Sequence, residues 1–323
     1  MTRLFRRALL VACACLVGAS SALAAYPDKP VRLIVPWAPG GSTDAIARAI
    51  AQRMGESLGQ SVIVDNRSGA SGRIGTEAAA KAAPDGYTIA IVELPHAIAP
   101  AVTAKLPYDL LKDFTPISMV GTSPLLLFVN GSKYKAGDIK GFLKDARASA
   151  TPVALAHSGN GSISHLSSEL FASAGGIKVN AIPYRGSAPA LTDVAAEQVA
   201  GHFATLASGA ALLSAGKISV LMTTGPARLA SMPQVPTARE AGLSGMQFNQ
   251  WWALVAPATT PIEVIERLRK EAIAALEHPA TRERLTTLGI DLKGSTRDEL
   301  RSFMRDEVGH WGAVVRKIGL QPE

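Results

Sequence analysis

Cysteine is almost absent from this 323-residue chain, and the two that occur, Cys13 and Cys15, both lie near the amino terminus. They fall in a segment that we expect to be removed, as argued below. The mature protein would then have no disulfide, no thiolate nucleophile and no sulfur ligand for a metal. Its stability must come from a hydrophobic core, and a chain that is 47% hydrophobic can form one in each of two domains.

Aromatic residues are also scarce, at 5% of the chain, which argues against a platform for stacking sugars or nucleobases. The formal net charge of +7 falls to +4 (30 basic against 26 acidic residues) once Arg3, Arg6 and Arg7 are removed with the leader. No run of Lys and Arg with interleaved aromatics is present, so we expect no nucleic-acid partner. The mild positive charge suits a small anionic ligand.

Familiar catalytic and metal-binding motifs are missing too. The chain has no Gly-x-x-x-x-Gly-Lys-Ser/Thr loop, no Gly-x-Ser-x-Gly elbow and no His-Glu-x-x-His. Its six histidines are scattered without carboxylates at ligand spacing, so no metal and no cofactor is expected. Ser164-His165 is the nearest approach to a nucleophile and base, but adjacent side chains on a helix point apart. We therefore predict no catalytic residues.

The amino terminus has the pattern of an export signal. Arg3, Arg6 and Arg7 precede an apolar stretch over 8–23, and the small residues before Ala25 suit a signal peptidase. We expect residues 1–24 to be removed and the mature protein to be periplasmic. A retained membrane anchor would need a longer apolar stretch. Lipidation at Cys13 is the other alternative.

Behind this segment, apolar strands alternate with amphipathic helices. The first unit has predicted strands at 31–35, 62–64 and 87–92, and helices at 42–58 and 75–83. The second unit has predicted strands at 153–156, 179–182 and 218–222, and helices at 162–174 and 188–196. This order is typical of an α/β protein in which mostly parallel sheets are flanked by helices.

The chain is expected to cross twice between these units, at the apolar segments 125–129 and 252–256. Lobe 1 would then comprise 25–125 and 253–323, and lobe 2 would comprise 126–252. The carboxy-terminal part is helical, with predicted capping boxes at 260–263 and 296–299. We expect its helices to pack back on lobe 1.

Four turns rich in Gly and Ser follow predicted strands, at 39–44, 66–72, 158–162 and 184–187. In open α/β sheets, ligands bind outside the carboxyl ends of the strands. Small residues let backbone N–H groups approach an anion, and hydroxyl groups add further donors. A single such turn could be a simple connection. Four of them in corresponding places favour an anion site between the units.

Motifs spaced over the whole mature chain carry a family resemblance. They are Tyr26-Pro27-Asp28-Lys29-Pro30, Val35-Pro36-Trp37-Ala38-Pro39-Gly40-Gly41, Asp65-Asn66-Arg67-Ser68-Gly69-Ala70, Pro84-Asp85-Gly86-Tyr87, Leu106-Pro107-Tyr108-Asp109, Ser164-His165-Leu166, Pro183-Tyr184-Arg185-Gly186-Ser187-Ala188 and Val235-Pro236-Thr237-Ala238-Arg239-Glu240-Ala241-Gly242. With these motifs in this order, the chain resembles the Bug-type substrate-binding proteins of tripartite tricarboxylate transporters.

The resemblance implies a two-lobed periplasmic binding protein of the type 2-like architecture, with its ligand cleft between the lobes. Such a protein is a monomer, not an enzyme, that closes on a small carboxylate and delivers it to membrane permease subunits. The implied ligand-binding residues of lobe 1 are Trp37, Gly40, Gly41, Ser42, Thr43, Asp44, Ser68, Gly69, Ala70 and Ser71. Those of lobe 2 are Ser158, Gly159, Gly161, Ser162, His165, Tyr184, Gly186, Ser187, Ala204 and Thr205.

The resemblance also implies how the ligand is held. Backbone amides, hydroxyl groups and bridging waters hold the carboxylate, and no salt bridge is required. Asp44 is expected to stabilise the start of its helix rather than to contact the ligand. His165 is expected to fix its own loop.

Ala204 and Thr205 bear on the class of ligand. Amino-acid-binding members of the family often have an acidic residue after the position of Phe203, where this chain has neither Asp nor Glu. With Trp37 as an aromatic wall, we expect an acid without an amino group, such as an aromatic or hydroxylated one. Glu93 could change this expectation if it faces the cleft. A periplasmic sensor for a membrane signalling protein and an exported α/β hydrolase are the alternative functions.

We predict that the mature protein begins near Ala25 and unfolds at the same temperature with and without reductant, because no cysteine remains. The mass of the exported amino terminus and thermal unfolding with and without dithiothreitol test this. A mass that begins at a lipidated Cys13, or a melting temperature that depends on the reductant, would contradict it.

Overall fold

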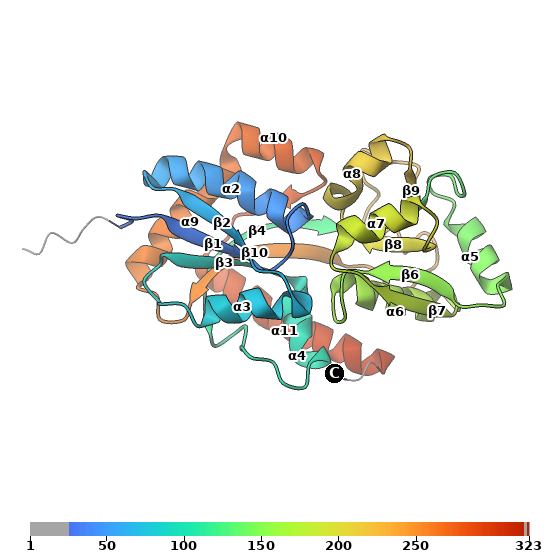
Figure 1. Ribbon diagram of the computed structural model, residues 1–323, viewed down its shortest axis with the longest axis horizontal. Helices are drawn as coiled ribbons and strands as arrows, with labels where there is room; N and C mark the ends of the chain where they lie inside the picture. Colours follow the sequence, from blue (N-terminus) through green and yellow to red (C-terminus); the bar gives the residue numbers. More distant parts are fainter. Residues whose placement is uncertain (1–25, 320–321, 323) are drawn as a thin grey trace, which may run out of the picture.

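The structure is a computed structural model that describes residues 26–319 and 322. Two sheets, each with helices on its faces, lie one beyond the other along the long axis of the molecule (Figure 1). The predicted signal segment, with Cys13 and Cys15, lies outside the described residues. Within the described part of the chain, no helix is both long enough and apolar enough to cross a membrane.

The first sheet has six strands in the order β11-β4-β10-β3-β1-β2. Their bounds are Val31–Val35 (β1), Val62–Asn66 (β2), Thr88–Glu93 (β3), Phe114–Pro124 (β4), Asn249–Pro257 (β10) and Asp291–Leu292 (β11). β1 pairs in parallel with β2 and β3, whereas β10 is antiparallel to both β3 and β4, and β11 is antiparallel to β4.

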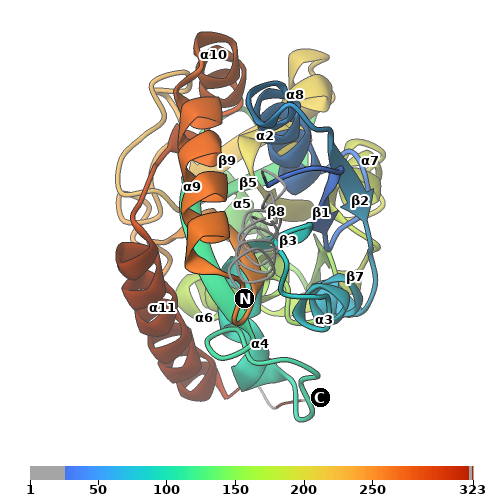
Figure 2. The ribbon, with the colours of Figure 1, turned by 90° about the vertical axis from the view of Figure 1, so that its left-hand side faces the viewer.

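Helices cover both faces of this sheet, which explains why β1 is apolar at nearly every position. Val31, Leu33 and Val35 pack in one cluster with α2 (Ser42–Leu58) and α9 (Ile262–Glu277). Ile34 points the other way, toward the cluster formed with α3 (Arg73–Ala80), α4 (Leu94–Val102) and α11 (Arg297–Ile318). In Figure 2, α2 lies above the strands and α3 below them. The short helix α10 (Pro279–Thr287) contacts α9.

The second sheet has five strands in the order β7-β6-β8-β5-β9. Their bounds are Leu126–Asn130 (β5), Val153–His157 (β6), Val179–Pro183 (β7), Gly201–Ala204 (β8) and Ile218–Thr223 (β9). The helices are α5 (Ile139–Ala148), α6 (Ile163–Gly175), α7 (Ser187–Ala195) and α8 (Leu206–Ser214). β6 is parallel to β7 and β8, and β5 is antiparallel to β8 and β9.

The α/β class is confirmed, but both sheets are mixed rather than mostly parallel. The reason is that β4, β5 and β10, which carry the chain between the sheets, run antiparallel to their neighbours. β4 reaches β5 through Leu125, and the return enters β10 at Asn249, so 249–252 pair in the first sheet. The predicted division into lobes at 126 and 252 stays a prediction.

The two predicted capping boxes have different outcomes. The Thr296 box is confirmed: its hydroxyl accepts from the Glu299 amide, and the Glu299 carboxylate accepts from the Thr296 amide. The Thr260 box is wrong, because the Thr260 hydroxyl donates instead to the carbonyl of Pro257 at 2.7 Å. Pro261 is the N-cap of α9, and no side chain caps that helix.

Candidate ligand-binding site

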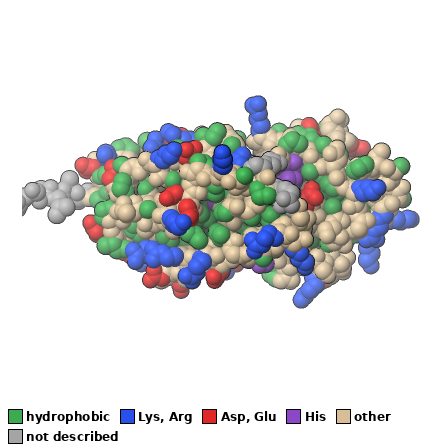
Figure 3. Space-filling model, turned by 90° about the horizontal axis from the view of Figure 1, so that it is seen from below, with side chains coloured by type: hydrophobic (Ala, Val, Ile, Leu, Met, Phe, Trp, Pro, Cys, Tyr) green, Lys and Arg blue, Asp and Glu red, His purple; other side chains and the backbone are tan. Residues whose placement is uncertain are grey.

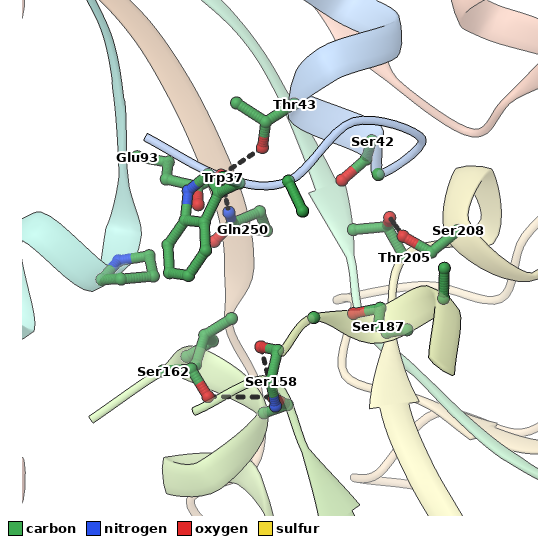
Figure 4. Close-up of a pocket in the computed structure, with 18 of the residues that line it drawn as sticks. Trp37, Ser42, Thr43, Glu93, Ser158, Ser162, Ser187, Thr205, Ser208 and Gln250 are labelled. Carbon is green, nitrogen blue, oxygen red and sulfur yellow. Dashed lines mark hydrogen bonds between the residues drawn. The ribbon is translucent and has the colours of Figure 1, made fainter. Parts of the chain in front are cut away.

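A pocket of about 750 Å³, including its open mouth, lies between the two sheets. In Figure 4, residues of the first sheet and its helices face residues of the second across it. Its lining residues from the first side are Trp37, Ala38, Pro39, Gly41, Ser42, Thr43, Glu93, Pro95 and Gln250, with Leu125 at the crossing. Those from the second side are Ser158, Ser162, Ile163, Ser164, Arg185, Gly186, Ser187, Ala188, Pro189, Phe203, Ala204, Thr205 and Ser208.

Five of the described helices begin at this pocket, and all five N-cap residues line it. Glu93 and Ser162 cap α4 and α6 with their own side chains, which accept from amides of the first turn. The other three N-caps are Gly41 of α2, Gly186 of α7 and Thr205 of α8, and no side chain caps these helices. The positive ends of three helices, with their first amides uncapped by side chains, therefore meet in one pocket.

The turn before α2 is held from behind by Asp44. Its carboxylate accepts from the Gly40 amide at 3.1 Å, from Asn66 Nδ2 at 3.0 Å and from Arg48 Nε at 3.0 Å. Burial alone would raise the pKa of Asp44, but these donors and the Arg48 charge lower it on balance. Asp44 does not line the pocket, so it positions the turn.

Half of the residues expected at the site line the pocket. They are Trp37, Gly41, Ser42, Thr43, Ser158, Ser162, Gly186, Ser187, Ala204 and Thr205. Contact between any of them and a ligand stays a prediction. The residues that were expected there but do not line it are Gly40, Asp44, Ser68, Gly69, Ala70, Ser71, Gly159, Gly161, His165 and Tyr184.

The loop 68–71 does not line the pocket, whereas Trp37 does, and the ring of Trp37 packs against Gly72 at the end of this loop. Ser71 instead reaches the second side of the molecule, where its hydroxyl donates to the carbonyl of Asn160 at 2.6 Å. Ala70 and Ser71 have φ values of 47° and 54°, so this loop is held in a left-handed conformation.

His165 and Tyr184 were also expected to line the pocket, but both have interaction partners elsewhere. His165 accepts from the Gly161 amide at 3.2 Å and stacks on His157, with ring centroids 4.4 Å apart. It fixes the loop before α6, as expected. The Tyr184 hydroxyl donates to Asp193 Oδ2 at 2.6 Å, which directs it along α7 rather than into the pocket.

Glu93 lines the pocket wall and is nearly enclosed, with 4% of its surface exposed. Its Oε2 accepts from the Thr43 hydroxyl at 2.7 Å and from Gln250 Nε2 at 2.6 Å (Figure 4). Trp252 Nε1 in turn donates to the Thr43 oxygen at 3.0 Å. Burial raises the pKa of Glu93 to about 7, although these hydrogen bonds oppose the rise.

Arg185 is the one cation, and Glu93 the one carboxylate, among the described residues that line the pocket. Arg185 is exposed, so it adds positive charge at the mouth without being buried. On the face drawn in Figure 3, Lys and Arg side chains are scattered among acidic and apolar ones rather than gathered in a stripe. Arg185 is thus the one formal positive charge among the described residues that line the pocket, beside the three uncapped helix amino termini.

Ser187 contacts a buried histidine. Its oxygen lies 3.0 Å from His202 Nε2, and His202 Nδ1 lies 2.9 Å from the carbonyl oxygen of Ala156. Since a carbonyl only accepts, Nδ1 carries the ring hydrogen and Nε2 accepts from the Ser187 hydroxyl. Burial lowers the pKa of His202 to about 4, which keeps the ring neutral.

Sequence reasoning missed several lining residues. Glu93 was an open question, and its signal was a Glu placed directly before a Leu-Pro helix start. Arg185 lies in the Gly/Ser turn at 184–187, but it was not among the residues expected at the site. Gln250 had no local signal, because it lies on a strand that follows a long irregular segment.

Comparison with known proteins gives concordant matches. The profile of the tripartite tricarboxylate transporter family receptor matches residues 46–320. The chain is 37% identical over 296 residues to the protein BugT of Bordetella pertussis, covering 91% of this chain and 90% of BugT.

Two similar solved structures contain carboxylates. One is an R. palustris protein, Rpa4515, with adipate, at 33% identity and a TM-score of 0.87, covering 92% of this chain and 100% of that one. The other is MatC from Rhodopseudomonas palustris with bound malate, at 33% identity and a TM-score of 0.84, covering 90% of this chain and 100% of MatC.

Replacing Gly41 with Leu is expected to block the approach of an anion to the α2 amides while the fold is retained. Gly41 has an ordinary φ of −81°, and a Cβ there would meet no heavy atom within 4 Å. We expect the affinity for the small carboxylate that binds the parent protein most tightly to fall at least about tenfold, with little change in melting temperature.

Gly309→Leu on α11 is the matched control, since a Cβ there is equally unobstructed. Calorimetric titration and thermal unfolding of both variants test the prediction. Unchanged affinity in a folded Gly41→Leu protein would place the anion site elsewhere, and loss of the fold would make the turn structural.

The raised pKa of Glu93 predicts a pH-dependent stability. Folding lifts this pKa from its ordinary 4.5 to about 7, so between these values the folded protein keeps a proton that the unfolded chain releases. The stability of the parent protein should therefore fall as the pH rises through this window, by up to about 1.4 kcal/mol per pH unit from this group.

In the Glu93→Gln variant the side chain at position 93 cannot titrate. The stability of this variant relative to the parent protein should therefore rise from pH 5 to pH 8. Denaturant unfolding of both proteins across this range measures the difference, in which the other titrating groups cancel. A difference that does not vary with pH would show that Glu93 is ionised throughout.

Proposed function

Because the chain belongs to the tripartite tricarboxylate transporter family of receptors, we propose that it is a periplasmic solute-binding protein that captures a small carboxylate between its two sheets. The observation that carries this proposal is the meeting of the α2, α7 and α8 amino termini, uncapped by side chains, at one pocket. Anions bind at helix N-termini because both the free amides and the helix dipole favour negative charge.

The chemistry of the pocket favours an acid without an ammonium group. Ala204 and Thr205 supply no carboxylate, and Glu93 is already bonded by Thr43, by Gln250 and by the α4 backbone. An ammonium group would lose its hydration here without gaining a free anion. Adipate and malate, which occupy the related structures, both lack one.

Capture is proposed to close the two lobes on each other. Both walls of the pocket contribute donors, so a ligand that bonds to both favours the closed arrangement over an open one. The hydrogen bond from Ser71 to Asn160 already joins the two sides of the molecule and would favour the closed arrangement.

Delivery to a membrane permease is the second part of the proposal, and the predicted export signal and the family relationship support it. A sensor for a membrane signalling protein would use the same pocket. Deleting the gene and measuring uptake of a radiolabelled ligand separates these roles: uptake should be lost if the protein serves transport. Normal uptake with a lost transcriptional response would favour the sensor.

We predict that small carboxylic acids stabilise the protein and compact it. A ligand at one hundred times its dissociation constant adds about 2.7 kcal/mol, which corresponds to a rise in melting temperature on the order of 5–10 °C. The matching amide should bind at least about tenfold more weakly, because it leaves the helix amides facing no anion.

A thermal-shift panel of mono-, di- and tricarboxylates, aromatic acids and their amides tests the binding. Small-angle X-ray scattering with and without the best acid tests the compaction. Failure of every carboxylate to stabilise the protein would contradict the proposal, and equal binding of an acid and its amide would contradict the role of the helix N-termini.

A further inference from the structure

Gln250 presents an unpaired acceptor to the pocket. This side chain comes from β10, is 4% exposed and lines the pocket wall. Its Nε2 donates to Glu93 Oε2 at 2.6 Å, whereas its Oε1 is buried and has no hydrogen-bond partner. A buried acceptor without a donor is rare in folded proteins.

The orientation of the amide is fixed by Glu93. While Glu93 is ionised, a flipped amide would place Oε1 2.6 Å from a carboxylate oxygen, and two acceptors would face each other. The same carboxylate oxygen also accepts from Thr43, whose hydrogen is committed because Thr43 itself accepts from Trp252. The network therefore holds Nε2 toward Glu93 and leaves Oε1 for a partner from the pocket.

This acceptor is unusual in a pocket built from donors. Uncapped helix N-termini and Arg185 offer N–H groups to a carboxylate, and none of these donors is hydrogen-bonded to Gln250 Oε1. A ligand that filled the pocket with only carboxylate and methylene groups would leave Oε1 unpaired. The pocket therefore favours a ligand that has a hydrogen-bond donor in addition to its carboxylate.

A hydroxyl group fits this requirement better than an ammonium group does. Trp37, which also lines this side of the pocket (Figure 4), carries a buried N–H donor that interacts with Glu93, so it adds to the donors of this region rather than to its acceptors. A hydroxyl can both donate and accept, whereas an ammonium group can only donate. An ammonium group would also meet the positive ends of three helices.

We propose that Gln250 is a specificity-determining residue whose Oε1 accepts a hydrogen bond from a ligand hydroxyl. The ligand is then a hydroxy acid. This inference rests on the proposed carboxylate-binding function. The deoxy acid of the same skeleton then binds more weakly, because Oε1 stays unpaired. Sites built to bond a hydroxyl reject analogues that lack it more strongly than apolar pockets reject an added one.

Calorimetric titration of the mature protein with matched acids tests the ligand class. Succinate, malate and aspartate share one skeleton and carry hydrogen, hydroxyl or ammonium at one carbon. Two further series place the variable group at another distance from the carboxylate or on a monocarboxylic acid. One is butyrate, 3-hydroxybutyrate and 3-aminobutyrate, and the other is propionate, lactate and alanine. In the series that binds most tightly, the hydroxy acid should exceed the deoxy acid at least about tenfold in affinity, and the amino acid should be the weakest.

Two variants test the residue. Gln250→Leu should bring the hydroxy and deoxy acids to equal affinity, because the acceptor is gone. Ser208→Ala, at the α8 side of the pocket, is the matched control and should keep the ratio of the two affinities even if both change. Thermal unfolding establishes that each variant is folded, and Gln250→Met is the substitute if the Leu variant is not.

The outcomes separate the two proposals. Equal binding of hydroxy and deoxy acids by the parent protein would overturn the hydroxy-acid inference and leave carboxylate binding intact. A hydroxyl preference that survives in Gln250→Leu would overturn the role of Gln250, and tightest binding of the amino acid would overturn the ligand class. No binding of any carboxylate would overturn the proposed function as well.

Discussion

The pocket depends on one buried carboxylate. Glu93, at the end of β3, accepts from Thr43 of α2, from Gln250 of β10 and from the first turn of α4, so a single side chain fixes three neighbouring elements. A charge buried this deeply is tolerated only because donors surround it. The consequence is a wall that is already ordered before a ligand arrives, which reduces the ordering that binding must impose.

The Glu93 carboxylate can lie beside an anion site because its hydrogen-bond donors compensate its charge locally. Burial raises its pKa to about 7, so near neutral pH Glu93 is only partly ionised. The helix dipoles act within about one turn, and the α2, α7 and α8 termini lie at the pocket itself. Attraction by neutral amides, with Arg185 at the mouth, gives a site that can hold an anion without a buried ion pair. Such a site can also release the anion.

The sequence predicted best what depends on local pattern. The strand over 31–35 and the helix over 42–58 have the predicted bounds. Both can be recognised from consecutive residues, the strand from its apolar run and the helix from the Gly-Gly pair before its start. The Gly/Ser turn at 68–71 follows β2 as predicted but does not line the pocket, because composition does not give the orientation of a turn. Gln250 could not be predicted, since its role arises from a contact with Glu93 157 residues away.

The contact between Ser187 and His202 does not have the properties of an activated serine. Activation of a serine needs a histidine that takes up a proton and is stabilised as a cation. His202 is fully buried, its pKa is lowered to about 4, and its Nδ1 donates to a neutral carbonyl, so an imidazolium is disfavoured there. The Ser187 hydrogen is instead committed to His202, which leaves only lone pairs on that oxygen. Donors from α7 to a ligand carboxylate must therefore be its backbone amides, as the uncapped Gly186 start allows.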